Sequence, residues 1–422
     1  MQVVLCSVVE RKRPLEGSTL PPNSKEPRLE SSTSTNFEDE EPSWERWKEI
    51  VLDALPESPV EETMMELPWN SSFSVRFRRN VVEQIIRDRD SLPYAPSMYD
   101  SREQSTPFGR LPLDRVVART ETSTIHAVVG ENVVIKYQAD CLEDVTLIHP
   151  LLIDFWFLQY LEPFRLSPKP FFVSPPTRLP PVKTHKSNVR ISNAGYEMCV
   201  RMKSIVRYGI MSKVGKNLHA VMYDYTDQRI PFLDVLVVGR SLIRVLMKLH
   251  DEAGVVHGDI HTGNFCMTEN RKNLIVIDFA RSRFVQETLV DKQVREPGEW
   301  NDPWLSVWEI EGKSIGRRDD VFKALISLAV LMNGNDYYQF LNDINDDPER
   351  CLKIKRDGNL FLADPSFNAV DALPHLETTK AAIKEKLVEI LDSSRAVKSA
   401  ADRPDYEAII ASFDAIIALI QA

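Results

Sequence analysis

The residues best suited to chemistry lie in a polar run near the middle of the chain, His-Gly-Asp-Ile-His-Thr-Gly-Asn at positions 257–264. This run contains Asp259 and Asn264, and Asp278 follows fourteen residues after Asn264. Phosphoryl transfer requires a carboxylate near the attacking hydroxyl, because that oxygen loses a proton as it attacks. It also requires hard oxygen ligands for magnesium, such as a carboxylate and an amide carbonyl. We therefore assign Asp259 to the first role and predict that Asn264 and Asp278 bind the metal.

Two predicted elements position these side chains. The apolar run at 274–277 indicates a buried strand, which places Asp278 at a rigid strand end. The apolar spacing at 230–250 predicts a long helix that leads into the polar run. Two acidic turns flanking an ordinary strand are the alternative interpretation, and the joint spacing of the three polar side chains argues against it.

These motifs resemble the signature of the protein-kinase-like superfamily, HxDxxxxN followed by a strand and Asp-Phe-Gly. The resemblance covers roughly residues 108–422, but Gly258 replaces the usual Arg and Ala280 replaces the final Gly. It implies an α+β, bilobal fold, with a small β-rich N-lobe at about 108–211 and a larger helical C-lobe at about 216–422. It also implies ATP and Mg²⁺ as cofactors.

The resemblance also identifies a cation in the N-lobe. Lys136 ends the run Val-Val-Ile-Lys-Tyr and matches the lysine of the third kinase strand, which contacts the nucleotide α- and β-phosphates. A helix expected over 149–161 takes the place of kinase helix C, and its Asp154 aligns with the acid that pairs with that lysine. The usual acid is Glu, which is one methylene longer. The strands of this region are predicted at 115–119, 125–129 and 133–137, with a hairpin turn at 130–132.

The turn at 120–124 occupies the place of the kinase glycine-rich loop but contains no glycine. Glycine lets backbone amides approach phosphates closely, so we expect the hydroxyls of Thr122 and Ser123 to contact the phosphates instead. Glu121 would be unfavourable beside a phosphate. This departure leaves an ATP-binding pseudokinase open as an alternative.

The segment at 207–214 resembles the kinase strand that runs into the interlobe hinge. In that interpretation Met211 is the gatekeeper, and the backbone of Ser212, Lys213 and Val214 bonds the adenine edge. An ordinary interior strand is the alternative.

His261 stands where protein Ser/Thr kinases carry a lysine that neutralises the transferred γ-phosphoryl group. An unperturbed imidazole has a pKa of about 6.5, and nearby phosphates would raise that pKa. We therefore expect His261 to be a catalytic, partly protonated donor. The sequence form His-Gly-Asp-Ile-His is also that of small-molecule kinases of the aminoglycoside and choline type.

Three segments resemble casein-kinase-type and vaccinia-related-type Ser/Thr kinases: 149–154, 317–320 and 403–406. Kinases carry an Asp at the start of the helix that the second segment opens, where it holds the catalytic-loop backbone. The expected function is therefore ATP-dependent transfer of the γ-phosphate to a Ser or Thr hydroxyl of a protein substrate. A small-molecule kinase and a binding-only pseudokinase are the alternatives.

Composition limits the possible partners. The net charge of −10 argues against a general nucleic-acid binder. The five cysteines have no CxxC spacing, which indicates a reducing compartment and no zinc site. No apolar run reaches the length of a membrane helix. The expected location is the cytoplasm or the nucleus.

The remaining segments are assigned by composition and periodicity. Residues 1–41 are predicted to be a disordered tail, in which basic residues at 11–13, 25 and 28 form either a split nuclear-import signal or a solvated basic tail. Residues 42–107 are predicted to be a helical extension and linker, with helices at 43–55 and 74–90 that dock on the catalytic domain or bind a partner. Further predictions are a linker at 92–109, an irregular loop at 167–186, an activation and substrate-binding loop at 281–311, and helices at 321–332, 381–391 and 406–420.

Overall fold

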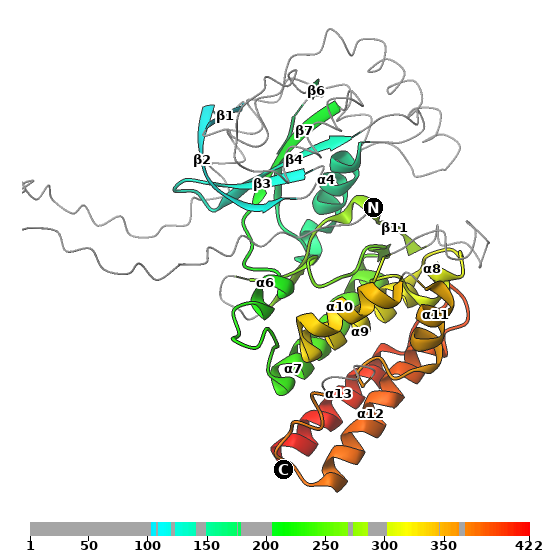
Figure 1. Cartoon of the computed structure of the whole chain (residues 1–422). Coiled ribbons are helices and arrows are strands. Elements are labelled where there is room, and N and C mark those ends of the chain that lie inside the picture. Colours follow the sequence, from blue (N-terminus) through cyan, green and yellow to red (C-terminus); the bar gives the residue numbers. More distant parts are fainter. Residues whose placement is uncertain are drawn as a thin grey trace, which may run out of the picture.

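The computed structural model describes residues 103–106, 109–119, 123–140, 149–174, 176–178, 205–268, 273–285, 302–345, 347–362 and 368–422. The predicted tail, its import signal and both N-terminal helices lie outside these residues. In Figure 1 the strands of the N-lobe form one layer, and the helices of the C-lobe form a second layer. This is the α+β, bilobal arrangement that the sequence predicts.

The N-lobe is built on an antiparallel sheet. Its order is β1-β2-β3-β4-β7-β5, and β6 also pairs with β7. The strands are β1 (Glu103–Thr106), β2 (Gly109–Arg119), β3 (Ser123–Val128), β4 (Val133–Asp140), β5 (Pro170–Val173), β6 (Thr177–Arg178) and β7 (Ile205–Ser212). Buried residues of β4, including Ile135 and Tyr137, pack with Val206 and Ile210 of β7. The β-branched and aromatic residues of these two strands therefore form the core of this lobe.

Three edge strands differ from the sequence predictions. The linker predicted at 92–109 is wrong at its end, because β1 pairs with the start of β2 and Gln104 accepts a 2.6 Å hydrogen bond from the Tyr137 hydroxyl. The irregular loop predicted at 167–186 contains β5 and β6, which both pair with β7. Pro170 is the first residue of β5, a position where a missing backbone N–H is tolerated. Tertiary pairing thus forms β1 and β6, whereas the Phe-Phe-Val run of β5 is a local strand signal that the prediction overlooked.

Helix α4 (Pro150–Leu161) confirms the element predicted at 149–161. His149 caps its first turn, since its Nδ1 atom accepts from the Leu151 N–H at 3.2 Å. Gly209 of β7 makes room for this helix. A Cβ atom at Gly209 would lie 2.2 Å from Cζ of Phe155, so a larger residue would require the Phe155 ring to move.

The C-lobe is helical. It contains α6 (Leu218–Met222), α7 (Phe232–Met247), α8 (Val307–Ile310), α9 (Arg317–Asn333), α10 (Asn335–Asn345), α11 (Pro348–Asp357), α12 (Glu377–Arg395) and α13 (Tyr406–Gln421). The helices predicted at 230–250, 321–332, 381–391 and 406–420 are confirmed. Two short hairpins pair β9 (Phe265–Met267) with β10 (Leu274–Val276), and β8 (Val255–Val256) with β11 (Arg283–Phe284). Within the described segments, no helix combines the length and apolar character needed to cross a membrane.

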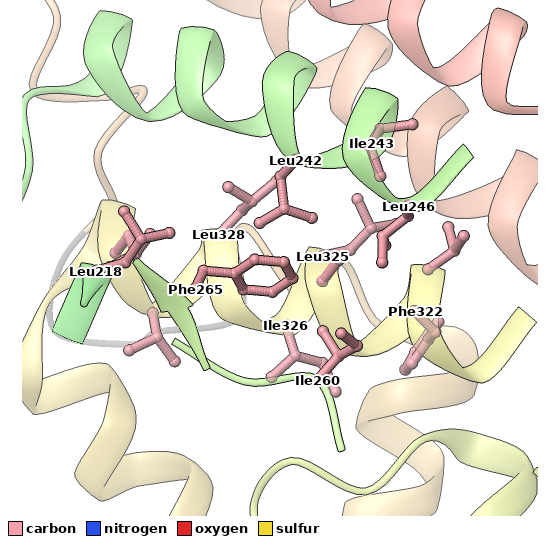
Figure 2. Packing of buried hydrophobic residues seen from close by; sticks show 14 of the residues in the cluster. Leu218, Leu242, Ile243, Leu246, Ile260, Phe265, Phe322, Leu325, Ile326 and Leu328 are labelled. Atoms are coloured by element: carbon pink, nitrogen blue, oxygen red, sulfur yellow. The ribbon is translucent and has the colours of Figure 1, made fainter. Parts of the chain in front are cut away.

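Helix α9 lies at the centre of this lobe and is buried along nearly its whole length. Figure 2 shows Leu242 and Leu246 of α7 over Leu325 and Leu328 of α9. Phe265, from the strand after the polar run, lies beside them. The apolar contact between α7 and α9 therefore fixes the platform on which the site is built.

We predict that Leu325→Ala destabilises the protein by about 2–5 kcal/mol, because it leaves a cavity at a side chain with no exposed surface. Chemical denaturation followed by circular dichroism measures this loss. Val388→Ala on α12 is the control, since Val388 is 40% exposed and its truncation should cost at most roughly 0.5 kcal/mol. Equal losses in the two variants would show that the contact between α7 and α9 is not the stabilising platform.

Candidate active site

The polar run at 257–264 lies in the loop between β8 and β9 and is anchored by apolar residues. Ile260 within the run and Phe265 directly after it have no exposed surface. Both pack into the cluster between α7 and α9 (Figure 2). Their burial fixes the backbone on both sides of Asp259, whose side chain keeps 27% of its surface exposed.

A carboxylate of α9 holds the same loop from the other side. Asp320 accepts from the backbone N–H groups of His257 at 2.7 Å and Gly258 at 2.9 Å, and it bonds His250 Nε2 at 3.0 Å. His250 Nδ1 in turn bonds the Tyr406 hydroxyl of α13 at 2.5 Å. Burial would raise the pKa of Asp320, but the His250 imidazole and the donated N–H groups hold it below its usual range. The contact expected from the segment 317–320 is therefore present.

Gly258 fits its position because its backbone is left-handed, with φ +79°. A Cβ atom there would lie 2.7 Å from the Arg281 carbonyl oxygen. The close approach also brings the Arg281 guanidinium to 3.4 Å from Asp259 Oδ1. Sequence reasoning missed Arg281, although its position three residues after Asp278 was a usable signal.

The two predicted metal ligands come together through the backbone. Asn264 donates from Nδ2 to the Asp259 carbonyl at 2.8 Å, so its Oδ1 atom is the oxygen left for a metal. The Asn264 carbonyl accepts from the Ile277 N–H at 3.0 Å, which ties the loop to the residue before Asp278. Asp278 has left-handed backbone angles, φ 66° and ψ 68°. For a residue other than glycine this conformation carries strain, and such strain is often found at functional sites.

Lys136 joins the loop that carries Asp278 to the N-lobe. Its Nζ atom donates to Asp154 Oδ2 and to Asp278 Oδ1, both at 2.9 Å. Asp154 Oδ1 also accepts from the Phe279 N–H at 2.8 Å. The predicted pairing of Lys136 with Asp154 is confirmed, and the shorter acid reaches the lysine without difficulty.

The pKa values of Lys136 and Asp278 are shifted in directions that favour their charged forms. Burial alone would lower the pKa of Lys136, but the two carboxylates raise it well above its usual value. Burial would likewise raise the pKa of Asp278, yet the Lys136 ammonium holds it below its usual value. Asp278 is therefore ionised, and 41% of its side chain surface is exposed and accessible to a ligand.

The oxygen donors of Asn264 and Asp278 suit magnesium better than a metal ion whose ligands all come from the protein. Among the described residues, no group of three or more His, Cys, Asp and Glu side chains is arranged to hold a metal ion. Magnesium usually takes one or two protein oxygens and completes its shell with phosphates and water. Asn264 and Asp278 supply oxygens of this kind, so the residues present suit the ion. The role of both as metal ligands stays a prediction.

Backbone hydrogen bonds within the protein limit which groups of residues 212–214 can bind adenine. The Ser212 N–H donates to the Lys169 carbonyl at 2.8 Å, and the Lys213 N–H donates to the Asn132 carbonyl at 2.9 Å. Their N–H groups are therefore already used, and the expected bonding of the 212–214 backbone to the adenine edge stays a prediction. Within the described part of the chain, the Val214 N–H has no such partner and is the donor available to adenine, while Ser212 can still offer its carbonyl.

The other nucleotide-contact predictions remain open. Met211 is 7% exposed and packs in the core at the end of β7, as expected of a gatekeeper position. Ser123 is half-buried at the start of β3. Thr122 lies outside the described residues. Binding of phosphates by Thr122 and Ser123 thus stays a prediction.

The partial protonation expected of His261 depends on nearby phosphates and stays a prediction. The Gly263 N–H donates to His261 Nδ1 at 3.0 Å, so this nitrogen carries a lone pair and the proton of the ring is on Nε2. Burial lowers the pKa of His261 below 6.5, although the carboxylates of Asp259 and Asp302 act in the opposite direction. The ring lies 5.7 Å from that of Trp304. His261 can therefore donate a hydrogen bond as a neutral imidazole.

Comparison with solved structures identifies the architecture. A structure of vaccinia related kinase 3 superimposes with a TM-score of 0.51 at 15% sequence identity, over 80% of this chain and 96% of that chain. The chain has a protein-kinase-like fold. No protein-family model matches the chain, and no curated protein matches it in sequence.

We predict that the His261 ring is neutral and carries its proton on Nε2 at pH 7. Nitrogen chemical shifts of ¹⁵N-labelled histidine report the tautomer directly, and His261→Gln identifies the signal. Because burial lowers the pKa, the midpoint of the ring's titration should lie below pH 6.5. A signal that titrates above pH 6.5 without nucleotide would restore the charged interpretation.

Proposed function

We propose that the protein is a phosphotransferase that uses Mg-ATP. The observation that carries this proposal is that four residues from different segments of the sequence are linked by backbone and side-chain hydrogen bonds. Asp259, Asn264 and Asp278 meet across the loop after β8 and the loop after β10, and Lys136 of the N-lobe bonds Asp278. A metal ligand pair, a phosphate-binding cation and a carboxylate for the acceptor are the parts that phosphoryl transfer requires.

Each residue has a distinct proposed role. Asp259 orients the acceptor hydroxyl and accepts its proton. Asn264 and Asp278 hold the metal, whose charge stabilises the phosphates during transfer. Lys136 uses two of its three donors on Asp154 and Asp278, so its third donor can bind a phosphate oxygen. His261 donates through Nε2 to the transferred group without adding a charge.

For the acceptor, we propose a Ser or Thr hydroxyl of a protein. The segments 149–154, 317–320 and 403–406 resemble protein kinases and build α4, α9 and the start of α13. A small-molecule hydroxyl is the second candidate, favoured by His261 where protein kinases carry lysine. A binding-only pseudokinase is less consistent with the retention of all four polar residues, although the turn at 120–124 contains no glycine.

We predict that Asp259→Asn and Asp278→Asn both abolish transfer, by different routes. Loss of the acceptor carboxylate should leave nucleotide binding intact. Loss of the metal ligand should weaken Mg²⁺-dependent nucleotide binding. Removal of one essential group commonly lowers the rate by several powers of ten, roughly 10⁴-fold. Transfer from γ-labelled ATP to protein and metabolite pools measures the rate, and calorimetry with and without Mg²⁺ measures binding.

Asp336→Asn on α10 is the matched control, because Asp336 is 74% exposed and carries no proposed role. It should transfer phosphate at the wild-type rate. Labelling of proteins supports the proposed acceptor, and labelling of metabolites alone supports the second candidate. Wild-type turnover in both Asp259→Asn and Asp278→Asn would refute the site assignment.

We also predict that transfer does not require phosphorylation of the segment at 281–311. In many kinases the Arg next to the catalytic Asp binds a phosphate of that segment and orders it. Gly258 supplies no charge at this position, and its space is taken by the Arg281 carbonyl. Phosphatase-treated protein should therefore keep its activity. An inert dephosphorylated protein that recovers when this segment is phosphorylated again would overturn this prediction.

A further inference from the structure

A buried lysine of α9 contacts the catalytic loop directly. Lys323 is 2% exposed, and its Nζ atom donates to the Gly258 carbonyl at 3.2 Å and to Glu309 Oε1 at 2.8 Å. Glu309 is also 2% exposed. Burial alone would lower the pKa of Lys323, but the Glu309 carboxylate holds it above its usual value. The lysine is therefore a buried cation with two specific partners.

The partner carboxylate is itself fixed by α8. Glu309 Oε2 accepts from the Ser306 N–H at 2.9 Å, and the Ser306 hydroxyl accepts from the Glu309 N–H at 3.1 Å. This reciprocal capping box holds the glutamate rigidly at the start of the helix. One Glu309 oxygen thus caps α8, and the other faces Lys323.

The bond from Lys323 to the Gly258 carbonyl matters because Gly258 directly precedes Asp259. Asp320 binds the N–H groups of His257 and Gly258, whereas Lys323 binds the Gly258 carbonyl, which belongs to the peptide that leads into Asp259. The two α9 side chains thus hold consecutive peptide groups by their N–H and C=O ends. Together they restrict rotation of the peptide that precedes the acceptor carboxylate.

We propose that Lys323 is a positioning residue that sets the orientation of Asp259 by bonding the Gly258 carbonyl, with Glu309 as the carboxylate that keeps the ammonium in place. The inference rests on the proposed function of Asp259. Through its ammonium group, Lys323 also connects α8, at the end of the segment 281–311, to the loop at 257–264. Loss of this bond should lower the rate of transfer more than the affinity for ATP.

Two variants separate positioning from stability. Glu309→Gln retains the cap on Ser306 and leaves Lys323 bonded to Gly258, but it leaves a buried cation without its carboxylate, which is destabilising. The double variant Lys323→Met with Glu309→Gln removes both buried charges, which restores stability but leaves the Gly258 carbonyl without its lysine donor. Stability and loop positioning therefore change in opposite directions between the two proteins.

The experiment measures kcat, the KM for ATP, thermal stability and hydrogen exchange of the peptide covering 255–264. We expect the double variant to melt above Glu309→Gln, yet to have a kcat about 10- to 100-fold below it, with the KM for ATP within about threefold of wild type. Its 255–264 peptide should exchange faster than that of wild type. Lys386→Met removes a lysine that pairs with Glu389 on the surface of α12, and it should change none of these quantities.

A kcat that follows thermal stability across the variants, with unchanged exchange at 255–264, would reduce Lys323 to a structural role and overturn the proposal. If the wild-type protein turns over no Mg-ATP, the proposed function fails. Hydrogen exchange then decides the positioning role alone: faster exchange in the double variant supports it, and unchanged exchange refutes it.

Discussion

The Lys136 ammonium is shared by two carboxylates that belong to different parts of the fold. Asp154 lies on α4 and Asp278 lies in the loop after β10, while the lysine itself comes from the central sheet. A buried cation is costly unless it is paired, so the sheet, the helix and the loop must stay together for the charge to be tolerated. The arrangement of the two lobes around the site depends on this interaction.

The loop at 257–264 is held in the C-lobe by both apolar packing and polar hydrogen bonds. Ile260 and Phe265 hold the catalytic loop against α7 and α9 by burial, which is strong but not directional. Asp320 and Lys323 add directional bonds to single peptide groups of that loop. Buried charges of this kind are weak evidence for stability, since apolar replacements often stabilise as well. Their value here lies in fixing where Asp259 points.

The sequence predicted the parts of the site whose residue types and spacing are constrained by chemistry. Asn264 and Asp278 are linked through the backbone as expected, and Lys136 pairs with Asp154, because the strand and helix that carry this pair have clear sequence patterns. The strands β1 and β6 escaped prediction, since pairing with their neighbours forms them rather than local propensity. The short Phe-Phe-Val run of β5 was overlooked among the prolines of 167–186.

The remaining differences depend on contacts between distant residues. The lowered pKa of His261 follows from burial, and the bond from the Gly263 N–H sets its tautomer, neither of which a reference pKa can reveal. The N–H groups of Ser212 and Lys213 are bonded to the Lys169 and Asn132 carbonyls, contacts that the hinge sequence alone does not show. Lys323 and Glu309 are fourteen residues apart and read as ordinary surface charges in the sequence. Their burial is visible only once α8 and α9 are packed.

The bond between His250 and Tyr406 has a consequence for the order in which the protein matures. Tyr406 lies 156 residues after His250, on a helix that packs against α7. During synthesis on the ribosome, His250, Asp320 and the catalytic loop all emerge before this helix does. His250 can bond the Tyr406 hydroxyl through Nδ1 only after α13 has been synthesised. The site therefore gains its final geometry late in translation.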